Sequence, residues 1–270
     1  MGTRFYPNLV HSLGSVRATA DRLISVWLPP RCLHCGTVLP NGLHRRSSAD
    51  GRGAVGRVLC HPCRVSLAES RLMRCDLPLM VGTTLLAARW MFSDTSPVRS
   101  LHHAFKYEGR ADVAPVLAGP LAGAVRGLLP PGWKEGRGMF ADGPPVCTGV
   151  PSHRLRVLDR GYCQAHLLAE SLAAGLGVPF RSRLLERREH TLSQTTLSAA
   201  DRRRNVARAF HLAPNACVPP AIILVDDVVT TGATLAGCAH VLRSAGCRFL
   251  FLAAPGVRPP LPLGGHFQPF

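Results

Sequence analysis

The sequence predicts a mixed α/β fold with a parallel sheet, preceded by a small module that contains two cysteine pairs. The apolar run Ala221–Val225 has the length and β-branched content of a strand buried on both faces. A helical segment, 233–245, and a second apolar strand, 248–254, follow it. That order of strand, helix and strand is typical of a right-handed parallel crossover. The spacing Cys-x-x-Cys occurs twice near the N-terminus, in Cys32, Cys35, Cys60 and Cys63.

The other expected elements lie between the cysteines and this sheet. Two strands and three helices are expected, at 83–92 and 146–151 and at 97–107, 113–129 and 164–176. Gly177 and Gly246 stand where left-handed helix caps are expected. We also expect a weak amphipathic helix at 1–28 and a mobile loop at 41–57. A connector is expected at 64–80, and a Pro/Gly-rich loop at 130–145. We therefore expect an N-terminal helix and cysteine module at 1–80 and an α/β domain at 81–270.

Composition favours a folded, soluble protein. Hydrophobic residues make up 46% of the 270 residues and charged residues 18%, which excludes wholesale disorder. No apolar run approaches the roughly 18–20 residues that span a bilayer. Polar residues interrupt any apolar region near the N-terminus, so we expect no signal peptide, and a cytoplasmic location follows as the expectation. Without an export signal, the ten cysteines do not suggest a disulfide framework.

The net charge of +16 suits a polyanionic partner, either a nucleic acid or a ligand with several phosphates. All basic residues except Lys106 and Lys134 are arginine, and such a bias also fits a GC-rich coding sequence. The segment 181–208 holds eight arginines against three acidic residues. It is open to three interpretations: a loop that closes over pyrophosphate, a nucleic-acid groove, or a solvated charged face.

The two cysteine pairs predict a structural zinc site. Two residues between cysteines let one turn aim both sulfur atoms at a single ion, and two such turns complete a tetrahedron. Four thiolates fill every position, so the site is closed rather than catalytic. Metal binding then supplies the fold of a module that is too small for a core of its own.

The segment after the strand 221–225 has the features of a phosphate site. Two carboxylates, Asp226 and Asp227, end the strand, and the loop 230–234 opens a helix. Backbone N–H groups of such a loop and the helix N-terminus attract a phosphate, and Gly232 permits close approach. The carboxylates suit sugar hydroxyls or a bridging cation. An ordinary helix cap at a solvated strand end is the alternative, but the whole ordered string predicts a phosphorylated sugar as ligand.

The string Val225-Asp-Asp-Val-Val-Thr-Thr-Gly-Ala-Thr234 resembles the phosphoribosyl pyrophosphate motif of type I phosphoribosyltransferases. The whole chain resembles the ComF family, which is linked to competence for DNA uptake and in which a cysteine zinc module precedes such a domain. Three further segments carry this resemblance, at 103–110, 150–164 and 194–210. Tyr162-Cys163 departs from the usual Phe-Asn of the family, and the insertion 41–57 is long.

The resemblance implies a type I phosphoribosyltransferase-like domain behind a four-cysteine zinc ribbon, with roles for particular residues. Asp226 and Asp227 would hold the ribose hydroxyls, directly or through Mg²⁺. The residues expected around the 5-phosphate are Thr230, Thr231, Gly232, Ala233 and Thr234. The candidates for the pyrophosphate are Lys106, Arg110, Arg154 and Arg160, because each lies in a matching segment.

The chemistry remains open at this stage. Relatives that salvage purines place an acidic residue in the phosphate loop, where this chain has Thr230, which cannot act as a carboxylate base. No catalytic residue follows from the sequence. Three hypotheses share the fold: transfer of a phosphoribosyl group to an unknown acceptor, binding of phosphoribosyl pyrophosphate or a nucleotide without turnover, and contact with single-stranded DNA or the DNA-uptake machinery.

Overall fold

The computed structural model describes residues 29–40, 52–70, 79–81, 84–93, 95–188 and 209–258. Its main sheet has six strands in the order β1-β2-β8-β6-β3, with β7 paired to β8. The strand β1 is antiparallel to β2, and all other pairs are parallel. The bounds of these strands are Leu79–Val81 (β1), Thr84–Met91 (β2), Val146–Gly149 (β3), Ala221–Val225 (β6), Val228–Val229 (β7) and Phe249–Val257 (β8).

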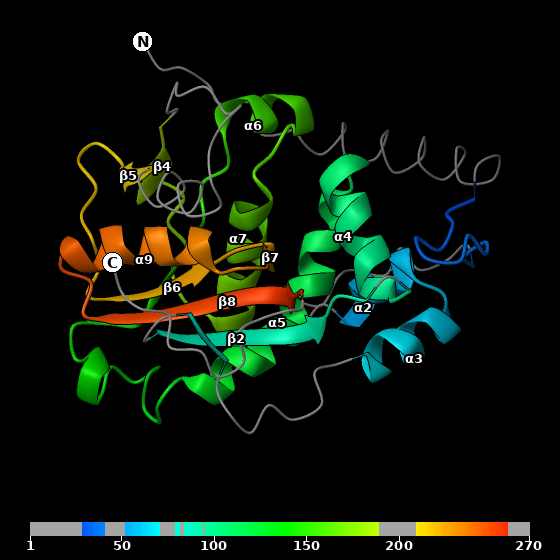
Figure 1. The fold of residues 1–270 in the computed structure, drawn as a ribbon. Helices are drawn as coiled ribbons and strands as arrows, with labels where there is room; N and C mark the ends of the chain where they lie inside the picture. The colour runs from blue at the N-terminus through cyan, green and yellow to red at the C-terminus, as the bar shows by residue number, and fades with distance from the viewer. Residues whose placement is uncertain are drawn as a thin grey trace, which may run out of the picture.

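The remaining elements cover or extend this sheet. A separate antiparallel pair consists of β4 (Leu185–Arg187) and β5 (Phe210–Leu212). The helices are α2 (Arg52–Val58), α3 (His61–Glu69), α4 (Pro97–Tyr107), α5 (Ala114–Leu128), α6 (Arg154–Arg160), α7 (Gln164–Leu176) and α9 (Ala233–Ser244), with short 3₁₀ turns at Ala111–Val113 and Gly138–Phe140. Figure 1 shows α9 on one side of the sheet, with β6 and β8 beside it.

The core has two layers because β6 is buried on both faces. Ile223 and Val225 belong to a hydrophobic cluster that includes residues of α5 and α7. Ile222 and Leu224 belong to a second cluster, which includes Leu235 and other residues of α9. Side chains alternate between the faces of a strand, so a continuous apolar run fills both layers. The predicted α/β fold with a parallel sheet is confirmed.

The cysteine module packs against the same core as α5 and α7. Leu59, Cys63 and Leu67 are buried members of that cluster. The indole Nε1 of Trp90 in β2 donates to the carbonyl of Leu67 at 3.0 Å. In Figure 1 the helices α2 and α3 lie near α4, at one end of the sheet. The division of the chain at residue 80 stays a prediction.

Several predicted boundaries need correction. The loop expected at 41–57 is helical from Arg52, and the connector expected at 64–80 begins as α3, which ends at Glu69. Pro62 in the first turn of α3 favours a helix start there. The strand expected to end at residue 254 continues to Val257, because β2 and β7 both pair with Gly256 beyond Pro255. The helix expected at 1–28 lies outside the described residues.

Candidate ligand cavity and cysteine cluster

The two aspartates lie at the carboxyl end of β6, the usual position of ligands in parallel α/β sheets. The backbone N–H of Asp226 donates to the carbonyl of Ala253 in β8 at 3.0 Å, which continues the ladder to this point. The Oδ1 atom of Asp226 accepts the N–H of Asp227 at 2.8 Å, and Oδ1 of Asp227 accepts the N–H of Val228 at 2.9 Å. Local hydrogen bonds therefore fix both carboxylates.

The helix α4 places two basic side chains against Asp227. The Nε2 atom of His102 lies 3.1 Å from Oδ2 of Asp227, and Nζ of Lys106 lies 3.8 Å from the same oxygen. His102 and Lys106 are four residues apart, so they share one face of the helix. Only 19% of the Asp227 side chain is exposed, which limits screening of these contacts by solvent.

The pKa values of the two carboxyl groups are shifted in opposite directions. Burial and the neighbouring charge of Asp227 raise the pKa of Asp226 well above its ordinary value. Burial also tends to raise the pKa of Asp227, but the hydrogen bond from His102 and the charges of His102 and Lys106 outweigh it and hold this pKa below its ordinary value. Asp227 is therefore the more acidic carboxyl of the pair.

The loop after β7 presents backbone amides at the start of α9. Gly232 has φ +74°, a left-handed conformation that favours glycine. The N–H of Ala233 donates to the hydroxyl of Thr231 at 3.4 Å, and no side chain caps the N-terminus of α9 in the described part of the chain. Thr230 and Thr231 are exposed. A helix N-terminus with glycine at its N-cap and hydroxyls beside it is suited to bind an anion.

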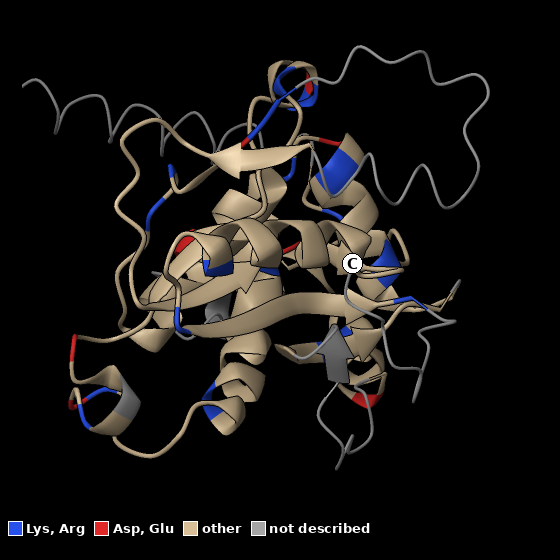
Figure 2. Ribbon diagram, turned by 60° about the vertical axis from the view of Figure 1, so that its left-hand side comes forward, with Lys and Arg blue, Asp and Glu red and all other residues tan. Residues whose placement is uncertain are grey.

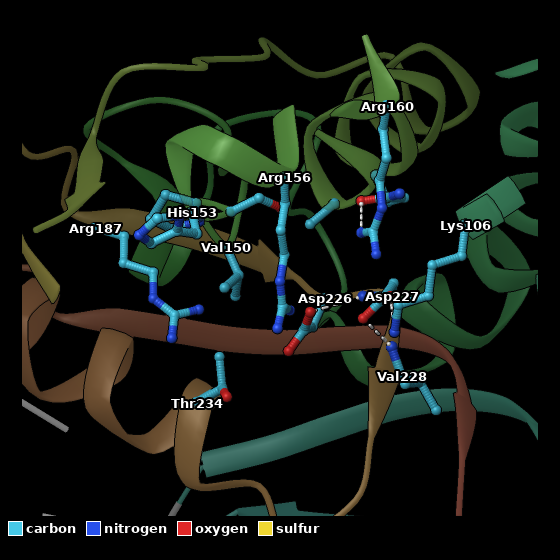
Figure 3. Close-up of a pocket in the computed structure, with 14 residues that line it drawn as sticks. Lys106, Val150, His153, Arg156, Arg160, Arg187, Asp226, Asp227, Val228 and Thr234 are labelled. Atoms are coloured by element: carbon cyan, nitrogen blue, oxygen red, sulfur yellow. Dashed lines mark hydrogen bonds and ion pairs between the residues drawn. The ribbon is translucent and has the colours of Figure 1, made fainter. Parts of the chain in front are cut away.

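A cavity connects the aspartates, α9 and a group of basic side chains. Figure 3 shows Arg156 and Arg187 extending toward the space between Asp226 and Thr234. The residues that line this cavity are Lys106, Val150, Pro151, Ser152, His153, Arg156, Arg160, Gln164, Ala165, Arg187, Asp226, Asp227, Val228 and Thr234. Four cationic side chains and two carboxylates thus surround one space.

The structure brings together part of the predicted site. Of the predicted residues, five line the cavity: Lys106, Arg160, Asp226, Asp227 and Thr234. Arg110 forms two hydrogen bonds to Asp112, at 2.9 and 2.8 Å, and neither it nor Arg154 is among the lining residues. Their roles at a pyrophosphate stay predictions.

Two arginines of the cavity were not predicted as site residues. Arg156 lies two positions after the predicted Arg154 in α6, the short helix that Figure 2 shows at the top of the view with basic residues in blue. Arg187 lies in β4 with its guanidinium over the ring of Phe210, at 5.6 Å from the centroid. Burial and the charge of Arg156 lower the pKa of Arg187. Repulsion between two such cations is relieved when an anion binds between them.

A thiol lies directly behind one wall of the cavity. The Sγ atom of Cys163 is 3.2 Å from the hydroxyl of Ser152, which lines the cavity. Burial raises the pKa of Cys163, but His166 and the hydroxyl of Ser152 lower it more strongly, to about 7. By the resemblance to the ComF family, Cys163 stands at a position where asparagine is usual, so a thiol replaces an amide there.

The four predicted metal ligands form one cluster away from the cavity. The sulfur atoms of Cys32, Cys35, Cys60 and Cys63 all lie within 4.8 Å of one another. The sulfur atoms of Cys35 and Cys60 are 3.5 Å apart. A zinc ion bound at about 2.3 Å by four sulfur atoms requires ligands this close. Four such thiols can hold a metal ion such as zinc.

The pKa values of two thiols in this cluster shift in opposite directions. Burial and the neighbouring thiols raise the pKa of Cys63, whereas hydrogen bonds to Thr37 lower the pKa of Cys35. Cysteine binds metals as the thiolate. Four thiolates in contact repel one another unless a positive ion lies between them.

Three curated proteins share substantial sequence with the chain. Competence protein F of Haemophilus influenzae is 41% identical over 105 residues, which cover 38% of this chain and 46% of that protein. DNA utilization protein YhgH of Salmonella typhimurium is 34% identical over 155 residues, 56% of this chain and 63% of that protein. The YhgH protein of Escherichia coli O157:H7 is 29% identical over 223 residues, 81% of this chain and 93% of that protein. The matches thus span less than two thirds of the first two relatives.

Solved structures with partial likeness include two proteins that bind nucleotides. Glutamine phosphoribosylpyrophosphate amidotransferase from B. subtilis, complexed with ADP and GMP, is 19% identical with a TM-score of 0.33, over 57% of this chain and 30% of that chain. Adenine phosphoribosyl transferase from Trypanosoma brucei is 11% identical with a TM-score of 0.35, over 77% and 85%. These TM-scores are too low to support an argument, so the description of the fold rests on the strand order of this chain.

Two observations are negative. No protein-family model matches the chain. Within the ranges that the structure describes, no helix has the length and apolar character needed to cross a membrane. The sequence relatives, in contrast, agree with the predicted resemblance to the ComF family: the chain is a homologue of Competence protein F and of the YhgH DNA utilization proteins.

Proposed function

We propose that the cavity binds phosphoribosyl pyrophosphate together with Mg²⁺. One observation carries the proposal: two carboxylates, Thr234 in the first turn of α9 and four cationic side chains border a single cavity. A phosphorylated sugar with a second anionic group matches this combination, because carboxylates accept from hydroxyls while amides and cations bind phosphates.

In the proposed complex each part of the ligand faces a different wall. The 5-phosphate binds the loop 230–234 and the first turn of α9, and the ribose hydroxyls donate to Asp226 and Asp227. The pyrophosphate lies among the basic residues of the opposite wall. Those residues are Lys106, Arg156, Arg160 and Arg187, of which Lys106 and Arg160 were predicted from the sequence.

The donor set fits a magnesium ion. Mg²⁺ prefers oxygen ligands and binds one or two carboxylates together with phosphate groups of a substrate. Asp226 and Asp227 are adjacent, and burial together with their mutual repulsion raises the pKa of Asp226, so a divalent cation would stabilise the ionised pair. When bound, it would also stabilise the charge of a leaving pyrophosphate. We propose that these two residues hold it.

The names of the relatives suggest the process in which the ligand is used. We propose that the chain serves DNA utilization, as the names Competence protein F and DNA utilization protein imply for those proteins. Thr230 occupies the position of an acidic base in salvage enzymes, so any acceptor of the phosphoribosyl group would have to be activated by another residue.

We also propose that the cysteine cluster is a structural zinc site. All four ligands are thiols, which leaves no open position for a substrate. We propose that zinc joins the two segments 29–40 and 52–70 and thereby supports their packing on the core.

Titration of the full chain with phosphoribosyl pyrophosphate and Mg²⁺, followed by calorimetry, tests the ligand. We expect saturable binding, and we expect Asp226→Asn with Asp227→Asn to weaken it by roughly tenfold or more, because charged hydrogen bonds contribute about 1.5–3 kcal/mol each. The control is Asp142→Asn, which removes an exposed aspartate paired with Arg248 outside the cavity.

The outcomes separate the hypotheses. Equal affinity of the double variant and the parent would reject the assignment of the aspartates. Release of pyrophosphate in the presence of candidate bases would identify a transferase, whereas binding without release would identify a sensor. Each result follows from the same purified protein.

A further inference from the structure

The helix α7 begins at the wall of the cavity opposite α9. Its first two residues, Gln164 and Ala165, line the cavity, and no described side chain caps its N-terminus. The close position of this turn depends on Gly149 at the end of β3, where a Cβ atom would lie 2.5 Å from the carbonyl carbon and oxygen of Ala165. The positive end of a second helix of 13 residues therefore faces the cavity.

The side chain of Gln164 provides an independent sign of a ligand. Only 3% of this residue is exposed, and its Nε2 atom makes no hydrogen bond with any residue that the structure describes. Buried amide groups are nearly always paired, because an unmade hydrogen bond costs free energy. A buried donor without a partner at the edge of a cationic cavity indicates an acceptor that binds there.

Arg160 fixes which end of the amide is unpaired. Its Nη1 atom donates to Oε1 of Gln164 at 3.1 Å, and this hydrogen bond is drawn as a dashed line in Figure 3. A guanidinium group has only donors, so the amide oxygen must face Arg160 and the NH₂ group must point elsewhere. Because Arg160 and Gln164 both line the cavity, an anion that pairs with Arg160 lies next to the Gln164 amide.

We infer that the first turn of α7, Gln164 and Arg160 form a second anion subsite, in which the Gln164 amide donates to an oxygen of a diphosphate group. The inference rests on the proposed function, since it assigns the two ends of one ligand to the two helix N-termini: the terminal phosphate to α9 and the diphosphate to α7. Ligands with a single phosphate occupy only the α9 end. Gln164 therefore determines preference for a ligand with both groups.

Calorimetry with three probes tests the subsite: inorganic pyrophosphate, ribose 5-phosphate and phosphoribosyl pyrophosphate, each with Mg²⁺. The variants are Gln164→Leu, which removes both the donor and the acceptor of Arg160 at similar volume, and Gln164→Glu, which keeps an acceptor for Arg160 but places a negative charge toward the anion. We expect pyrophosphate affinity to fall roughly tenfold in the first and further in the second, and ribose 5-phosphate affinity to change less than about twofold.

Thermal unfolding distinguishes this role from a structural one. Gln164→Glu keeps the acceptor for Arg160, so its unfolding midpoint should stay close to that of the parent, whereas Gln164→Leu loses the hydrogen bond from Arg160 together with the unpaired donor. Unchanged pyrophosphate affinity of a folded Gln164→Glu variant would overturn the inference. The probes also separate the two proposals. If the wild-type protein binds ribose 5-phosphate but not pyrophosphate, the proposed α9 site is supported and the α7 subsite is rejected. If it binds pyrophosphate but not ribose 5-phosphate, only the α7 subsite is supported.

Discussion

The environment of Cys163 changes the chemistry of a single side chain. Burial raises the pKa of this thiol, but His166 and Ser152 outweigh burial and lower the pKa to about 7 from an ordinary value of 9.0. The thiolate, which is the reactive form, therefore becomes abundant near neutral pH. Only 9% of Cys163 is exposed, so alkylation by iodoacetamide should be slow, but we expect its rate, followed by peptide mass spectrometry, to rise between about pH 6 and about pH 8 and then to level off.

Two other cysteines of the chain provide internal controls. Burial raises the pKa of Cys147 to about 12 and that of Cys247 to about 11, so neither should react in the same range. The variant His166→Gln should move the midpoint for Cys163 to higher pH. A pH profile of Cys163 that is flat, or that is unaltered in this variant, would contradict the proposed effect of His166.

The same residue has a consequence for stability. The pKa of Cys163 in the folded chain lies below its ordinary value, so the contribution of its thiolate is fully present above the unfolded pKa. That contribution is lost as the pH falls through the folded pKa near 7. Burial lowers the pKa of the partner His166, but its hydrogen bond and charge interaction with Cys163 outweigh burial and raise the pKa overall.

At the level of secondary structure, the contact between β3 and α7 depends on one glycine. An added Cβ at Gly149 would lie 2.5 Å from backbone atoms of Ala165 and 2.7 Å from the ring of His166. Backbone atoms cannot move aside as a flexible side chain can, so we expect Gly149→Ala to lower the free energy of unfolding by roughly 1–3 kcal/mol. Chemical denaturation monitored by circular dichroism measures this change.

Gly127 in α5 is the matched control. An added Cβ there meets no atom within 4 Å, and replacement of glycine by alanine inside a helix usually stabilises a protein by about 0.5–1 kcal/mol. The two substitutions are chemically identical and should therefore change stability in opposite directions. A Gly149→Ala variant as stable as Gly127→Ala would show that α7 can move away from β3.

The elements predicted from sequence were those with strong local signals. The bounds of α4, α7 and β6 match their predictions, because proline begins α4, Gly177 ends α7 and an unbroken apolar run forms β6. The helix α6, which was not predicted, also ends at a left-handed glycine, Gly161, but it has no buried residue and exposes Leu155 and Leu158. Without a buried face, the periodicity of a helix is not visible in a sequence.

The candidate site was predictable in its acidic half and less so in its basic half. The aspartates and the loop 230–234 follow one another in the chain, so a single segment reveals them. Arg156 and Arg187, in contrast, reach the cavity from α6 and from β4. Among 32 basic residues, most of them arginine, only tertiary structure shows which side chains converge. Gln164 is neutral, and its importance depends on an unpaired atom that no sequence pattern shows.

Considered as a whole, the molecule links the cysteine cluster to the ligand cavity through α4. His34, inside the first cysteine pair, has Nδ1 2.9 Å from the hydroxyl of Ser100 in α4. The same helix carries His102 and Lys106, which contact Asp227. Zinc would order the segments 29–40 and 52–70, which contact α4. The metal should therefore influence both the stability of the protein and its affinity for the ligand.

The double variant Cys60→Ser with Cys63→Ser tests this link in the full chain. We expect it to lose stoichiometric zinc, measured by elemental analysis, and to unfold at a lower temperature. It should also bind phosphoribosyl pyrophosphate severalfold more weakly, because α4 would no longer hold Lys106 and His102 firmly against Asp227. The control is Cys217→Ser, an exposed cysteine outside the cluster. Equal metal content in variant and parent would reject the zinc site, whereas loss of metal with unchanged ligand affinity would show that the cavity is independent of the cysteine module.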